Sequence, residues 1–142
     1  IYTTEHTLSL HDALPISFTQ ALALNPGGAE ALAYRSLSLR DPGQKCADAQ
    51  QSAQTAPANE VVRFALADCA FSKGDYNEAR QQLEGLISGT EYPHPNWEEL
   101  LGDTLALTGN IQGALTYWQK AADHGSASPN LARKIANLRY EE

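Results

Sequence analysis

The stretch LGDTLALTGNIQGALTYWQKA, residues 101–121, sets the pattern for most of the chain. It places two short apolar segments on either side of Gly109-Asn110. The same order of residue types occurs 35 residues earlier, around Gly74-Asp75. The matched positions are Leu101 with Leu66, Gly102 with Ala67, Leu105 with Ala70, Ala114 with Ala79, Trp118 with Leu83, and Ala121 with Leu86. A period of this length indicates a repeated supersecondary unit.

Each repeat is predicted to be two antiparallel helices joined at the glycine. In the earlier repeat the apolar positions fall at helical spacing on both sides of the turn, with Val62, Leu66 and Ala70 before it and Ala79, Leu83 and Leu86 after it. Gly74 supplies a left-handed helix stop, and Asp75 with Glu78 predicts a capping box for the second helix. Helices this short do not bury an apolar stripe alone, so neighbouring pairs are expected to stack.

Similar signals bound the other helices. Gly89, Gly109 and Gly125 stand where helices should end, and Ser128-Pro129 reads as a cap followed by a first-turn proline. A final helix is therefore expected from Pro129 to about Tyr140. It would place Leu131, Ile135 and Leu138 on one face, with Arg133, Lys134 and Arg139 off that face.

These residues resemble the tetratricopeptide repeat family. The matching motifs are Leu101-Gly102-x2-Leu105 with Ala114-x3-Trp118-x2-Ala121, and the Gly-Asp-Tyr-x-Glu-Ala run over residues 74–79. The resemblance covers residues 18–142 and implies an all-α, right-handed α-solenoid of antiparallel helix hairpins. The expected divisions are 18–27 (the remnant of an upstream repeat), 28–57, 58–92 and 93–127 (three repeats), and 128–142 (a capping helix).

Residues 1–17 follow no helical or alternating period and lack the basic start and apolar centre of a signal peptide. The codons ACT CTT TCC CTA CAC GAC GCT CTT CCG ATC T encode Thr7 to Ile16 and begin Ser17. That string resembles a short-read sequencing adapter, so this segment is expected to be non-native and is set apart from the fold. We also expect, from the absence of methionine, that the chain is processed or is a piece of a longer protein.

Composition and motifs exclude several classes of function. With 10 Lys+Arg against 17 Asp+Glu, the net charge of −7 disfavours binding to nucleic acid and to anionic membranes, and no apolar run is long enough for membrane insertion. Catalysis is not expected, because His94 and His124 are predicted to be turn residues and no nucleophile or acid–base pair accompanies them. The carboxylates lack metal-site spacing, and no cofactor motif is present.

Cys46 and Cys69 are predicted to be neighbours in a stacked array. The favoured interpretation is two small buried thiols, and the alternative is a disulfide, which would indicate an oxidising compartment.

A partner-binding groove follows from the resemblance, whose first helices line a concave surface. The expected lining is two sets of residues at helical spacing, Phe64, Asp68 and Phe71, then Asn96, Glu99 and Asp103. Exposed phenylalanines flanked by carboxylates would suit a peptide with apolar anchors and basic flanks. Packing of Phe64 and Phe71 against the next hairpin is an equal alternative. The acidic residues exclude a clamp for a peptide's C-terminal carboxylate.

The resemblance implies a protein–protein interaction module or scaffold, and no enzyme. Two alternatives stay open, a regulatory tail of a larger enzyme and a redox-responsive module that uses Cys46 and Cys69. The sequence does not decide between a cytoplasmic and a periplasmic location.

Overall fold

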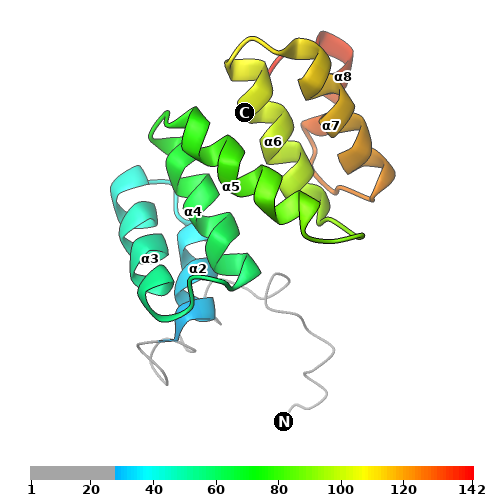
Figure 1. Cartoon of the computed structure of the whole chain (residues 1–142). Helices are drawn as coiled ribbons and strands as arrows, with labels where there is room; N and C mark the ends of the chain where they lie inside the picture. Colours follow the sequence, from blue (N-terminus) through cyan, green and yellow to red (C-terminus); the bar gives the residue numbers. More distant parts are fainter. Residues whose placement is uncertain (1–27) are drawn as a thin grey trace. The chain divides into compact units, whose positions relative to one another are not determined.

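The computed structural model describes residues 28–142, which contain seven helices packed in sequential pairs (Figure 1). The prediction of an all-helical chain of hairpins is confirmed for these residues. The right-handed superhelical course stays a prediction. The expectations for residues 1–17 and for the repeat remnant at 18–27 lie outside the described residues.

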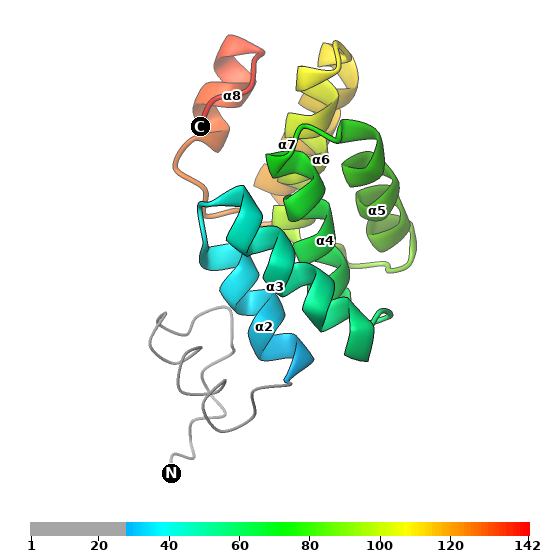
Figure 2. The ribbon, with the colours of Figure 1, turned by 90° about the vertical axis from the view of Figure 1, so that its left-hand side faces the viewer.

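The described residues fall into two compact units that divide after Cys69. The first unit holds α2 (Ala29–Ser38), α3 (Pro42–Thr55) and most of α4 (Glu60–Ser72). Figure 2 shows α2 and α3 side by side. The second unit holds the end of α4 followed by α5 (Tyr76–Ser88), α6 (Pro95–Leu107), α7 (Ile111–Asp123) and α8 (Leu131–Asn137).

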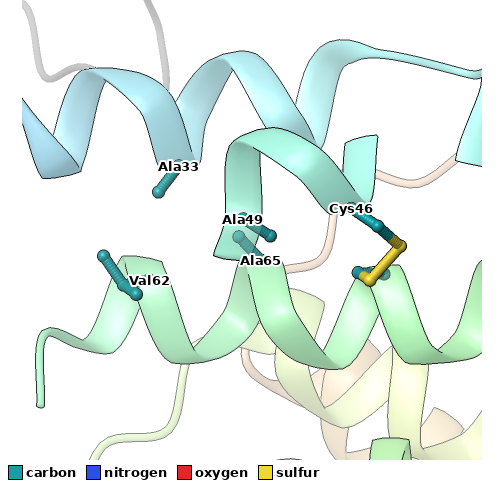
Figure 3. Close-up of a cluster of buried hydrophobic side chains, with 6 residues drawn as sticks. Ala33, Cys46, Ala49, Val62 and Ala65 are labelled. Atoms are coloured by element: carbon teal, nitrogen blue, oxygen red, sulfur yellow. A yellow bond between two sulfur atoms is a disulfide. The ribbon is translucent and has the colours of Figure 1, made fainter. Parts of the chain in front are cut away.

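Small side chains make up the core of the first unit. Helices α2, α3 and α4 each contribute to one buried cluster, drawn in Figure 3, which consists of Ala33, Cys46, Ala49, Val62, Ala65 and Cys69. Alanines let the helix backbones approach closely, but each buries little apolar area. The sulfur atoms of the two cysteines are bonded at the end of this cluster, joining α3 to α4.

In the second unit, α6 and α7 pack closely where a glycine of α6 faces a tryptophan of α7. Trp118 of α7 is fully buried, as are the neighbouring Ala114 and Ala121. A Cβ atom built on Gly102 of α6 would lie 2.6 Å from the indole Nε1 of Trp118 and 3.1 Å from the carbonyl oxygen of Ala114. The small residue at position 102 therefore makes room for the buried indole of Trp118.

The helix ends follow the local signals in the sequence. Gly74 and Gly109 adopt positive φ angles of 81° and 92° after α4 and α6. The next residue in each case caps the following helix. Asp75 accepts a hydrogen bond from the backbone N–H of Glu78 at 3.4 Å, and Asn110 accepts one from that of Gly113 at 2.9 Å. Local sequence thus sets where each hairpin turns.

The last helix differs from the expectation. It begins at Leu131, with Asn130 as its N-cap residue, and ends at Asn137, so it is shorter than the predicted span from Pro129 to about Tyr140. Ser128 does not cap it, because its hydroxyl donates to a carboxylate on α6 instead. Of the predicted apolar face, Leu131 is buried and Ile135 is half-buried, whereas Leu138 lies past the helix end with a positive φ of 52° and is 44% exposed.

Candidate functional site

Two of the predicted groove residues, Glu99 and Asp103, lie one turn apart on α6 and meet a lysine from α8. The ammonium nitrogen of Lys134 lies 2.7 Å from Oε2 of Glu99 and 3.0 Å from Oδ1 of Asp103. All three residues are buried, with Lys134 at 4% exposure, Asp103 at 6% and Glu99 at 8%. We call Glu99 and Asp103 the acidic site.

Further donors complete this arrangement. The indole N–H of Trp118 donates to Oδ1 of Asp103 at 3.0 Å. The hydroxyl groups of Ser126 and Ser128 donate to the two oxygens of Glu99, at 3.2 and 2.8 Å. Charged groups removed from water need such hydrogen bonds to offset their lost hydration. Within the described residues, no buried side-chain nitrogen or oxygen lacks a hydrogen-bond partner.

The acidic site contains more negative charge than Lys134 supplies in positive charge, because two carboxylates share one ammonium group. Burial raises the pKa of Asp103 to about 6, although the neighbouring Lys134 and the Trp118 N–H both act to lower it, and the charge of Glu99 raises it further. Asp103 therefore pays a desolvation cost that its partners offset only in part.

A second polar contact lies beside the acidic site. Nδ1 of His124, which follows α7, lies 2.7 Å from Oε1 of Glu98, a residue only 1% exposed on α6. The sequence placed His124 in a turn and gave Glu98 no partner. Their sequence separation of 26 residues explains why no local pattern indicated this pair.

The end of the chain also reaches Phe71, another predicted groove residue. The ring of Tyr140 meets that of Phe71 edge to face, with centroids 5.8 Å apart, and Tyr76 meets it similarly at 5.5 Å. The ammonium group of Lys134 lies 5.5 Å from the centroid of the Tyr140 ring. Three predicted groove residues, Phe71, Glu99 and Asp103, thus contact the segment after α7.

The expectation of open carboxylates is therefore corrected for Glu99 and Asp103. The sequence placed Lys134 off the packed face of the last helix, whereas the structure buries it against α6. The reason is that α8 packs through positions 131 and 134, and the second of these is a charged residue that needs carboxylate partners. Asn96, at the start of α6, is exposed.

The two groove residues of the first unit, Phe64 and Asp68, are both partly buried. The carboxylate of Asp68 pairs with the buried ammonium group of Lys45 from α3. Burial raises the pKa of Asp68 more than this lysine lowers it. Asp68 thus links α4 to α3 through an ion pair.

The cysteines adopt the less favoured of the two alternatives. Cys46 and Cys69 form a disulfide with their Cα atoms 5.0 Å apart, and both residues are buried. Because the thiolate that attacks a disulfide must reach a sulfur atom, burial disfavours rapid exchange. The bond therefore fits a structural role in the first unit better than a reactive one.

A shallow surface cavity of about 420 Å³ lies on the first unit, lined by Arg35, Leu39, Gln44, Ala47 and Asp48. Its two charged residues bind each other, with Nε of Arg35 2.6 Å from Asp48 and the terminal nitrogen 2.8 Å away. The cavity accordingly presents a neutralised pair to an incoming ligand.

Neither a metal centre nor a membrane span was found in the part of the chain that the structure describes. Residues 28–142 contain no group of three or more His, Cys, Asp or Glu side chains that could hold a metal ion. None of the helices in this range is long and apolar enough to cross a membrane.

Part of the chain matches a known protein-family model. Residues 47–102 match the family model described as tetratricopeptide repeat. The match begins within α3 and extends through α4 and α5 into α6. A comparison with curated proteins gave no match.

Proposed function

We propose that this chain, which contains a tetratricopeptide repeat segment over residues 47–102, binds a peptide or protein segment that carries basic and apolar side chains. Tetratricopeptide repeat domains are generally protein-interaction modules and are typically non-catalytic. The proposed contact surface is the part of the second unit formed by Phe71, Asn96, Glu99 and Asp103. For the first unit, taken by itself, Phe64 and Asp68 of α4 are proposed as groove residues.

The observation that carries this proposal is the contact between the acidic site and Lys134. A lysine ammonium group fits between Glu99 and Asp103, and an aromatic ring fits against Phe71, within one short stretch of chain. Partner segments with a cation and an aromatic or aliphatic residue at similar separation would use the same contacts. Lys134 and Tyr140 are six positions apart.

The same chemistry opposes binding of a peptide's C-terminal carboxylate. Glu99 and Asp103 are both acidic, and a third carboxylate beside them would be repelled in a site with little water to screen the charges. We therefore propose a scaffold role through internal segments of a partner.

Selection from a multivalent random peptide display library on the full chain tests the proposal. We expect enrichment of peptides with a lysine or arginine a few positions from an aromatic or aliphatic residue. A control with Glu99→Gln and Asp103→Asn keeps the shape of the acidic site but removes its charge, and should lose this enrichment. Selection of acidic peptides, or equal enrichment on the control, would contradict the proposed function.

A further inference from the structure

We propose that residues 128–142 form an internal cover, which occupies the partner site of the second unit and must leave before a partner binds. This inference rests on the proposed function, because it names the segment that occupies the proposed partner site when no partner is bound. The cover includes α8 and supplies both Lys134 and Tyr140.

The cover carries the chemistry expected of a partner. Its ammonium group lies within 3.1 Å of both carboxylates of the acidic site, and its tyrosine ring lies against Phe71. Two serine hydroxyls on the connection from α7 to α8 bind Glu99 as well. An external segment with a cation and an aromatic ring would need the same acceptors and the same ring face, so the two cannot bind at once.

Helix α8 of the cover buries few of its own residues. Helix α8 has seven residues, well below the length of about 12 at which an isolated helix becomes marginally stable in water. Its buried residues are Leu131 and Lys134, and its N-cap residue, Asn130, makes no side-chain capping bond. The residue that follows the helix, Leu138, is exposed and has a positive φ angle, a backbone conformation that costs energy for a residue other than glycine.

The charge balance also favours exchange. Lys134 brings one positive charge to two buried carboxylates, so the covered site keeps an excess of negative charge. A partner with two neighbouring basic residues would neutralise the site more fully. Arginine can also bind carboxylates through two parallel hydrogen bonds.

The test uses the cover's own sequence as the probe. A fluorescein-labelled peptide of residues 128–142 is titrated against the full chain, and binding is followed by fluorescence polarisation. Leu131→Ala combined with Tyr140→Ala weakens the cover but leaves Glu99 and Asp103 intact. Leu138→Ala is the matched control, because it removes the same side-chain atoms as Leu131→Ala from an exposed position in the same segment.

We expect the probe to bind the double variant at least tenfold more tightly than the wild type or the Leu138→Ala control. The reason is that the apparent affinity falls with the fraction of molecules whose site is open. In the wild type, saturating probe should also speed amide hydrogen exchange over residues 131–137, as the internal helix is displaced. This second measurement does not depend on the folding of any variant.

The outcomes separate the two proposals. Equal affinity for the wild type and the double variant, with unchanged amide exchange in α8 at saturating probe, would overturn the cover and leave the proposed function standing. Failure of the probe to bind any of the three forms would overturn the proposed function itself.

Discussion

Replacing Gly102 by alanine should destabilise the second unit, although the same change in an open helix usually does the opposite. Alanine in place of glycine inside a helix gains about 1 kcal/mol from helix propensity. Here the added Cβ would lie 2.6 Å from Nε1 of Trp118, closer than real Cβ contacts, and 3.1 Å from the carbonyl of Ala114. Overpacking of a close-packed core typically costs about 1–3 kcal/mol, and Trp118 is held in place by its bond to Asp103. We expect a net loss of about 1–2 kcal/mol.

Urea unfolding followed by intrinsic fluorescence measures this effect, because both tryptophans of the chain, Trp97 and Trp118, lie in the second unit. The informative background is Trp118→Leu, which removes the indole atoms that the new Cβ would meet. The two substitutions together place at 102 and 118 the pair that the preceding repeat carries at Ala67 and Leu83. Trp97 still reports on unfolding in this background.

A double-mutant cycle then isolates the contact. Gly102→Ala should cost much less in the Trp118→Leu background than in the wild type, with a coupling energy of at least about 1 kcal/mol. If Gly102→Ala stabilises the wild type, or if its effect is the same in both backgrounds, the close approach of α6 and α7 at this point is not what requires glycine.

Three further predictions concern stability. Replacing Cys46 and Cys69 by alanine should lower the unfolding free energy of the first unit by about 3 kcal/mol, because the bond closes a loop with a sequence separation of 23 residues, and circular dichroism in urea with and without reductant measures the loss. Asp103 has a pKa of about 6 in the folded chain, above the ordinary value of 3.8, so the folded state binds its proton more tightly than the unfolded state does. The free energy of unfolding should therefore fall by roughly 2–3 kcal/mol as the pH rises from about 4 to 6. Urea unfolding at a series of pH values measures this slope, and Asp103→Asn should remove it. Asn110→Ala should cost about 1 kcal/mol by removing the cap on α7, while Asn110→Ser, which keeps an acceptor, should stay near the wild type.

Much of the fold could be predicted because its signals are local. Gly74, Gly109 and Gly125 end their helices with positive φ angles, as expected from a residue without a Cβ atom. The caps at Asp75 and Asn110 act over three residues, and the apolar stripes follow the helical period within each segment. Signals that act over so few residues can be recognised without knowing which helices pack together.

The candidate site could be predicted only in part. Spacing correctly placed Glu99 and Asp103 on one side of a helix, but it did not reveal that the side is covered by α8. The partner, Lys134, lies 31 and 35 residues away along the chain and was expected to lie off the packed face of the last helix. The residues next to Lys134 in the sequence resemble those around a solvent-exposed lysine, so no local signal indicated that it is buried.

Helix order, turn positions and the identity of the close-packed seam are thus written in the local spacing of small, apolar and capping residues, since backbone hydrogen bonding and side-chain period act within a few residues. The pairing of Cys46 with Cys69 and the burial of Lys134 arise from packing. The reason is that a disulfide, or an ion pair shielded from water, requires side chains from helices far apart in sequence to lie within bonding distance.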